Sequence, residues 1–270
     1  CSADGGSTWQ PCGAGLPFDS PVADLLVDDK HPAKIWVRTE DGRVWRSGDN
    51  ATNFEDASVN DQPVISLVKH PTTAGVLMAS DGRQLWKKED DKEWEPASYW
   101  KSTAPISLMA AATGDSGTLL MLQDDGTLLR STDGGDDYET IPNLPWDEKT
   151  VPEGIEFHPA RDGLVMAYGG DRIHRSLDDG ATWRPVEVAA PEADSKPMEI
   201  RDLVFDPTVR QMHLLTTSGG VYASKDLGKT WTPSNVGMAG RSSPSSAAVG
   251  PDGRVLLGMA DTDAGYSMDP

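Results

Sequence analysis

The groups best placed to do chemistry in this sequence are carboxylates that recur in one eight-residue pattern, Ser-x-Asp-x-Gly-x-Thr-Trp. Two roles are open for these aspartates. Asp4, Asp133 and Asp178 are candidate calcium ligands, or each Asp accepts hydrogen bonds from the backbone of its own turn. Because each segment offers one carboxylate and not a cluster of oxygen ligands, we expect the turn role and no bound metal. The pattern is complete at 2–9, 176–183 and 224–231, and degraded at 47–54, 87–94 and 131–138.

The other positions of this repeated turn also suit a structural role. Gly adopts the positive φ that other residues resist, and Trp buries a large apolar surface. We therefore expect the turns to brace the fold, and we predict no catalytic residue among them. The residues predicted to hold them are Asp4, Asp49, Asp133, Asp178 and Asp226, with Trp9, Trp94, Trp183 and Trp231.

A second set of small or polar residues lies at one aligned position on the first apolar run of each repeat. One interpretation is crowding, because first strands that gather around an axis leave no room for bulky side chains. The other is a water-filled channel in which Asp24 and Asp202 face a ligand. The pattern favours crowding, and the two carboxylates stay as candidate binding residues. The full set is Asp24, Ser66, Ser107, Gly154, Asp202 and Ser246.

Two tryptophans, Trp100 and Trp146, fall outside the repeated turns. They occupy loops of similar length that link one repeat to the next. Exposed together on one rim, they would anchor a protein partner or a sugar. Folded back over their own repeats, they would belong to the core. Both interpretations stay open, and we treat the pair as candidate binding residues.

Three His-Pro pairs recur in the sequence, beginning at His31, His70 and His158, and the fifth repeat has Asp206-Pro207 at the corresponding turn. Recurrence at one turn per repeat indicates a turn role and not metal binding. The sequence contains no Gly-rich phosphate loop and no Cys/His metal spacing. We therefore predict no cofactor.

The elements that carry these residues are predicted to be short strands. The repeated turns start at 2, 47, 87, 131, 176 and 224, so successive starts lie 40 to 48 residues apart. A period in this range signals a propeller or a solenoid. Between the turns, short apolar runs such as RQMHLLTTSGG end in turn residues, and no segment has a helical period. Four short antiparallel strands per repeat predict an all-β propeller.

The two chain ends complete this count. Five repeats lie wholly inside the sequence, and the last one, about 243–270, lacks a fourth strand. We expect residues 1–12 to supply that strand. The prediction is a single domain over 1–270, a six-bladed β-propeller of four-stranded antiparallel blades, closed by the N-terminal strand joining the C-terminal blade. Such closure would protect an otherwise unpaired strand edge.

The complete turns resemble the Asp-box, or bacterial neuraminidase repeat. It is known from sialidases, sortilin-type receptors, some endoglucanases and the photosystem II stability/assembly factor family. The resemblance covers the whole chain and implies the propeller fold. It implies sialidase chemistry only where three arginines, a Tyr–Glu pair and an acidic Asp are present, the first arginine in an Arg-Ile-Pro motif. This sequence has Arg172-Ile173-His174 instead, and no arginine triad can be assigned.

The net charge limits the classes of partner, and the cysteines indicate the cellular compartment. The chain has 24 Lys and Arg against 43 Asp and Glu, a formal net charge of −19. This charge disfavours nucleic acid and anionic lipid, and favours cationic partners or life in high salt. No apolar run approaches the roughly 18 residues of a membrane span. Cys1 and Cys12 either form a disulfide, or Cys1 carries a lipid; both place the protein outside the cytoplasm. Two unpaired thiols are the third alternative.

These observations predict a non-enzymatic binding or scaffold protein. We expect an extracytoplasmic accessory or assembly subunit, periplasmic, secreted or lipid-anchored, that binds a protein partner through the face carrying the inter-blade loops. Acidic patches would steer a basic partner to that face. The alternative is a glycan-active hydrolase, sialidase-like or another glycosidase, with its site at the channel mouth.

Overall fold

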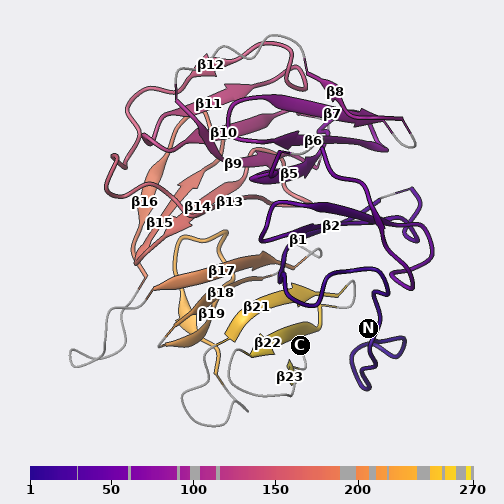
Figure 1. Ribbon diagram of the computed structural model, residues 1–270. Coiled ribbons are helices and arrows are strands. Elements are labelled where there is room, and N and C mark those ends of the chain that lie inside the picture. Colours follow the sequence, from indigo (N-terminus) through magenta and orange to yellow (C-terminus); the bar gives the residue numbers. More distant parts are fainter. Residues whose placement is uncertain are drawn as a thin grey trace. The chain divides into compact units, whose positions relative to one another are not determined.

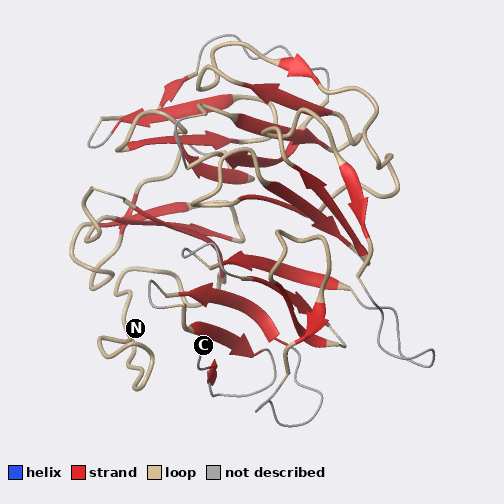
Figure 2. Ribbon diagram, turned by 180° about the vertical axis from the view of Figure 1, so that it is seen from behind, coloured by secondary structure: helices blue, strands red, loops and turns tan. Residues whose placement is uncertain are grey.

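The computed structural model describes residues 1–28, 30–59, 62–89, 92–97, 104–113, 116–188, 199–206, 211–217, 219–235, 244–250, 253–259 and 266–268. In these ranges the chain consists of strands, turns and loops (Figures 1 and 2). None of the described segments forms a helix that is long and apolar enough to cross a bilayer. The chain divides into two compact units, unit 1 (Cys1–Ala111 and Asp115–Thr140) and unit 2 (Ala112–Gly114 and Ile141–Pro270). The single-domain prediction stays a prediction.

Unit 1 contains three sheets, each of four antiparallel strands paired in chain order. The first sheet comprises β1 (Val22–Val27), β2 (Ile35–Thr39), β3 (Val44–Ser47) and β4 (Glu55–Asp56). The second comprises β5 (Ser66–Lys69), β6 (Val76–Ser80), β7 (Leu85–Glu89) and β8 (Glu95–Pro96). The third comprises β9 (Ile106–Ala111), β10 (Leu119–Gln123), β11 (Leu128–Ser131) and β12 (Glu139–Thr140).

Unit 2 contains two further four-stranded sheets and one sheet of three described strands. The fourth sheet comprises β13 (Gly154–Phe157), β14 (Val165–Gly169), β15 (Arg172–Ser176) and β16 (Arg184–Val186). The fifth comprises β17 (Ile200–Phe205), β18 (Met212–Thr216), β19 (Gly220–Ser224) and β20 (Thr232–Pro233). The last comprises β21 (Pro244–Val249), β22 (Val255–Met259) and β23 (Tyr266–Met268). The prediction of an all-β fold with four-stranded antiparallel sheets is confirmed.

The second strands of several sheets are deeply buried. Every residue of β6, β10 and β18 is buried. These strands are covered on both faces, so they read as continuous apolar runs and not as alternating ones. Neighbouring sheets within a unit share cores built from such strands: Leu77 of β6 packs in one cluster with Trp36 of β2, and Met166 of β14 packs with Leu214 of β18.

The predicted sixth four-stranded blade, shared between residues 1–12 and about 243–270, is wrong. Residues 1–12 contain no strand, so five sheets have four strands and closure is not shown. The N-terminal segment bonds to itself instead: Cys1 and Cys12 form a disulfide, and the Gln10 amide donates to the Cys1 carbonyl over 2.9 Å. The chain then pairs with the second repeated turn, where the Phe54 amide donates to the Ala14 carbonyl over 2.7 Å.

A complete repeated turn closes its hydrogen bonds within eight residues. In 176–183, one Asp178 oxygen accepts the Ser176 hydroxyl at 2.7 Å and the Thr182 amide at 2.8 Å, and the other accepts the Thr182 hydroxyl at 2.6 Å. The Ser176 hydroxyl oxygen accepts the Gly180 amide at 2.9 Å. Corresponding bonds to Asp and Ser recur at 2–9, 47–54, 131–138 and 224–231. Asp4, Asp49, Asp133, Asp178 and Asp226 thus each accept a backbone amide of their own turn.

These bonds stabilise the ionised carboxylates. Hydrogen bonds from Thr8 hold the pKa of Asp4 at about 2, and those from Asn53 hold the pKa of Asp49 at about 2. Burial raises the pKa of Asp226, but the bonds from Thr230, Ser224 and Lys229 outweigh it and leave the pKa at about 2. These carboxylates are thus ionised at neutral pH and accept hydrogen bonds within their own turns.

In the degraded turn of the second sheet, the residue at the position of the first Ser is not the one that the sequence spacing indicated. Strand pairing sets Ser47 opposite Ile35, but it sets Lys88, not Lys87, opposite the corresponding Leu77. Lys88 therefore takes the place of the buried Ser, one residue closer to Trp94 than the pattern requires. Lys88 is 8% exposed, and its ammonium donates to the Lys92 carbonyl and lies 5.8 and 5.9 Å from the ring centroids of Trp36 and Trp94.

We predict that Ser224→Ala destabilises the protein by about 1–3 kcal/mol, because it leaves the buried Gly228 amide without its acceptor. Urea denaturation measures the change. Ser2→Ala removes the same bond, to the Gly6 amide, in the turn whose Trp9 is 59% exposed. Water replaces the lost acceptor there, so a change below about 0.5 kcal/mol is expected. Equal losses of stability in both variants would contradict the expectation that this hydrogen bond matters more in a buried turn than in an exposed one.

Candidate functional site

The aligned column of small and polar residues links neighbouring sheets within each unit. The Ser66 hydroxyl oxygen accepts the Met109 amide at 3.0 Å, which joins the second sheet to the third. Asp24 forms an ion pair with Arg38, whose guanidinium also donates to the Val64 carbonyl at 3.5 Å before the second sheet. The column thus carries inter-sheet bonds, a role that neither crowding nor a channel predicted.

Asp202 makes the corresponding link in unit 2. Its carboxylate accepts the Leu203 amide at 2.8 Å and the Ala247 amide of the last sheet at 3.1 Å. Burial raises the pKa of Asp202, although hydrogen bonds from both amides and from Tyr168 lower it. Gly154 has no side chain because Tyr168 fills its place: a Cβ there would lie 2.2 Å from the Tyr168 ring. Asp24 and Asp202 are therefore both engaged within their own units.

Trp146 is a core residue of unit 2. It is 7% exposed, and its ring centroid lies 5.3 Å from those of His174 and Trp183, both in edge-to-face geometry. The hypothesis of an exposed aromatic on the rim is thereby corrected for Trp146, because the indole folds onto the following sheet and its repeated turn. Trp100 lies outside the described residues.

The other predicted aromatic braces differ in burial. Trp183 and Trp231 are 8% and 3% exposed, and the Trp94 indole donates to the Ala57 carbonyl of the first sheet at 2.8 Å. Trp9 is exposed, since no sheet of unit 1 packs over the first turn, although its indole N–H donates to the Gly6 carbonyl at 3.1 Å as the turn pattern requires. The Trp of a repeated turn thus packs between sheets where the turn follows a third strand, but not in the first turn.

Acidic residues gather at the turns between second and third strands of unit 1. Glu40, Asp41, Asp124 and Asp125 are all exposed there. Antiparallel pairing places these turns at the end of each sheet opposite to its repeated turn. The Asp124 amide donates to the Pro105 carbonyl at 3.1 Å, so this end of the third sheet also carries the loop that enters it. The loop end therefore presents exposed carboxylates, of which Asp41 lies 3.9 Å from the Arg43 guanidinium.

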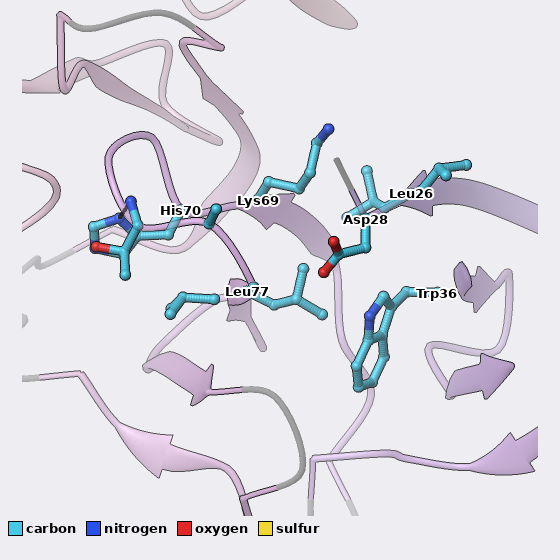
Figure 3. Close-up of a pocket in the computed structure, with 11 residues that line it drawn as sticks. Leu26, Asp28, Trp36, Lys69, His70 and Leu77 are labelled. Atoms are coloured by element: carbon cyan, nitrogen blue, oxygen red, sulfur yellow. Dashed lines mark hydrogen bonds between the residues drawn. The ribbon is translucent and has the colours of Figure 1, made fainter. Parts of the chain in front are cut away.

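A cleft lies at the other end of the strands, between the first two sheets (Figure 3). It consists of an inner recess of about 30 Å³ and an outer part of about 410 Å³. Leu26, Asp28 and Trp36 of the first sheet lie on one side of it. Lys69, His70 and Leu77 of the second sheet lie on the other, and Lys30, His31, Thr73 and Glu89 line the outer part.

Asp28 and His70 have the same structural role on the two walls of the cleft. Asp28 accepts the Lys30 and His31 amides at 2.8 and 2.7 Å, and the His70 ring accepts the Thr72 and Thr73 amides at 3.3 and 3.2 Å. Each caps the turn after a first strand. The prediction of a turn role is confirmed for His70, but His31-Pro32 is not its counterpart; Asp28, three residues earlier, is.

The cleft lies beside the degraded turn of the second sheet, whose Glu89 lines its outer part. In the third sheet, the repeated turn at 131–138 packs on the second sheet: Cβ atoms on Gly134 and Gly135 would lie 2.8 Å from the His70 ring and 3.1 Å from the Met78 side chain. Asp28 and Trp36 hold the equivalent positions in the first sheet, as their strand pairing shows. Asp28 is half-buried at the wall of this cavity.

Within the described residues, no three His, Cys, Asp or Glu side chains are close enough to share a metal ion. His70, His158 and His213 have lowered pKa values because they are buried, and burial lowers the pKa of His174 to about 4. These imidazoles are neutral at pH 7. In the described part of the chain, these histidines therefore cap turns or pack in the core.

Comparison with solved structures defines the class of protein: the chain is a β-propeller. An ancestral GH74 enzyme is 17% identical with a TM-score of 0.73 over 96% of this chain, which spans only 37% of that enzyme. YCF48 from Cyanidioschyzon merolae is 15% identical with a TM-score of 0.54, covering 92% of this chain and 95% of YCF48. A structure of YCF48 bound to D1 peptide is 15% identical with a TM-score of 0.50, covering 90% and 89%.

No family model and no curated protein matches the sequence. At these identities the structural likeness establishes the propeller fold alone. It does not establish the Asp-box family or a branch within it.

We predict that Asp202→Asn removes a pH-dependent loss of stability. The folded-state pKa of Asp202 is raised above its ordinary value of 3.8, so its contribution is favourable at low pH and is lost as the pH rises above that value. Asn keeps an acceptor for the backbone amides and carries no charge. The variant should be at least as stable as the wild type at pH 7, measured by urea denaturation from pH 3 to 8. A variant destabilised equally at every pH would contradict this.

We predict the opposite pH dependence for His174. Burial depresses its pKa from 6.5 to about 4, so stability is lost as the pH falls below 6.5. His174→Phe keeps the aromatic contact with Trp146 and cannot be protonated. Between pH 7 and pH 4, the variant should lose about 2 kcal/mol less stability than the wild type. The same denaturation series tests this, and parallel pH profiles would refute it.

Proposed function

We propose that this propeller is a non-enzymatic binding protein whose partner is a protein with a basic surface. The observation that carries the proposal is the state of the candidate catalytic carboxylates. Asp24 pairs with Arg38, Asp202 accepts backbone amides, and the five aspartates of the repeated turns bind their own turns. Carboxylates used to hold the backbone are not poised as a general acid and base, which need mobile protons and access to substrate.

The binding face in this proposal is the end of the sheets that carries the loops between them. Glu40, Asp41, Asp124 and Asp125 are exposed there, and the net charge of −19 gives the whole chain an attractive field for cations. Complementary charge raises the association rate and selects against acidic partners. The similarity in length to YCF48, which has been captured with a peptide, supports a protein ligand over a short substrate.

We place the protein outside the cytoplasm in this proposal. The Cys1–Cys12 disulfide supports an oxidising compartment. A lipid on Cys1 would need the same sulfur, so the disulfide and the anchor are alternatives, and intact mass distinguishes them. Membership in the Asp-box group, close to its non-enzymatic assembly factors, belongs to the same proposal and is supported by the geometry of the turns.

A glycan-active hydrolase is the second candidate, favoured by the fold of the GH74 enzyme. A panel of chromogenic glycosides tests it. Turnover that Asp24→Asn or Asp202→Asn abolishes, with the fold intact, would replace the binding proposal.

We predict that the double variant Asp124→Asn/Asp125→Asn weakens partner binding. Cross-linking and affinity capture from the extracytoplasmic fraction should give one stoichiometric basic protein, whose rate of association falls at least about threefold in the variant and with added salt. The matched control is Asp136→Asn/Asp137→Asn, which removes two exposed charges at the opposite end of the same sheet. Equal effects of the two variants would show that net charge, and not this face, governs binding.

A further inference from the structure

We propose that Asn50, in the second repeated turn, is a site of N-linked glycosylation. Asn50-Ala51-Thr52 has the pattern of an acceptor site, an Asn followed two residues later by Ser or Thr with no Pro between them. Use of this site rests on the extracytoplasmic location in the proposed function, because the pattern is read in secreted proteins.

The acceptor pattern occurs once in this sequence. The chain contains five asparagines, and only Asn50 has a hydroxyl residue two positions further on. The pattern therefore points to a single position, and the surroundings of that side chain decide whether it can be used. The other asparagines, with the residues that stand two positions after them, are Asn53 with Glu55, Asn60 with Gln62, Asn143 with Pro145, and Asn235 with Gly237.

The side chain of Asn50 is accessible. The residue is exposed and has a φ of 59°, a left-handed conformation that Asn adopts more readily than most residues. Its backbone amide donates to the Ala33 carbonyl at 3.1 Å, while its side chain makes no hydrogen bond to another described residue. The Nδ2 atom can therefore take a substituent without breaking a hydrogen bond of the fold.

Two other asparagines separate the features that Asn50 combines. Asn53 lies in the same turn, but its Nδ2 donates to the Asp49 carboxylate at 2.7 Å, so its side chain is part of the turn. Asn143 is exposed and has a φ of 55°, but Pro145 stands where a hydroxyl is required. Among these three, only Asn50 has the acceptor pattern together with an exposed side chain that is not hydrogen-bonded.

The reaction needs one co-substrate, an oligosaccharide linked to a lipid through a pyrophosphate. The Nδ2 atom of Asn50 forms a bond to the anomeric carbon of the first sugar. The bond between that carbon and the pyrophosphate oxygen breaks, and the lipid pyrophosphate leaves with the electron pair. Nδ2 loses one proton to a base of the transferase, so no oxidant or reductant is required.

The position of Asn50 is compatible with partner binding. The repeated turn lies at the end of the first sheet opposite to the turn between its second and third strands, which carries Glu40 and Asp41. A glycan on Asn50 would therefore leave the proposed binding end of this sheet uncovered.

Peptide mass spectrometry tests the proposal on the full chain, isolated from the extracytoplasmic fraction of its own host. Trypsin cleaves after Arg46 and Lys69, so one peptide, 47–69, contains Asn50, Asn53 and Asn60. We expect this peptide to carry the mass of an oligosaccharide, with fragmentation assigning it to Asn50. An unmodified peptide, or a sugar on another residue of it, would overturn the proposal.

Alkylation without reduction separates this outcome from failure of the proposed location. An unmodified peptide from chains whose Cys1 and Cys12 resist alkylation would refute glycosylation alone. An unmodified peptide from chains in which both cysteines are alkylated would count against the oxidising compartment as well.

Variants of Thr52, made in the same host, test the role of the hydroxyl. Thr52→Val keeps the shape of the side chain and removes the hydroxyl, so it should abolish the glycan, as should Asn50→Gln. Thr52→Ser is the matched control and should retain it. The Thr52 hydroxyl donates only within its turn, to the Asp49 carbonyl at 2.8 Å, and urea denaturation checks that the fold persists. A glycan kept in Thr52→Val, or lost equally in Thr52→Ser, would refute the assignment.

Discussion

The constraint on which this structure depends is that backbone amides at the ends of short strands must find acceptors without the help of long sheets. Each complete repeated turn solves this locally, with one Asp and one Ser that accept amides within eight residues of each other. At Gly228, φ is +73°, a conformation in which Gly is at ease. Ala51 holds the same place in the second turn with φ of +62°, so the hydrogen bonds of Asp49 and Ser47 suffice to keep even a residue with a Cβ there.

A second tier of bonds connects one sheet to the next. The first strands carry a bulge at the aligned column: pairing shifts register at Asp24, Asp202 and Ser246. A bulge disrupts the ladder locally, and in unit 2 the Asp202 carboxylate, beside such a bulge, accepts the Ala247 amide of the following sheet. Carboxylates that could act in catalysis in an open site are therefore bound to neighbouring groups of the protein. For this reason the proposed function places recognition at the loops and the charged turns.

The all-β class, the four-strand repeat and the role of the turn aspartates could be predicted from the sequence, because they follow from local patterns of turn residues and apolar runs. It failed where the answer depends on register or on packing. The shift from Lys87 to Lys88 needed strand pairing, and the equivalence of Asp28 with His70 needed the hydrogen bonds of two turns. Burial of Trp146 depended on the position of His174 across a loop. The cleft itself had no signal in the sequence beyond the loss of the turn pattern at 87–94.

The first repeated turn, 2–9, forms no part of any sheet, yet it has the same bonds at nearly the same lengths as the turns that cap third strands. The motif thus forms without a sheet around it, here inside a segment that the Cys1–Cys12 disulfide also closes. Because all its contacts span at most eight positions, the loop-closure entropy of forming it is small. Such segments are suited to act as early nuclei during folding, each fixing the reversal of a hairpin while the strands on either side are still searching for their partners.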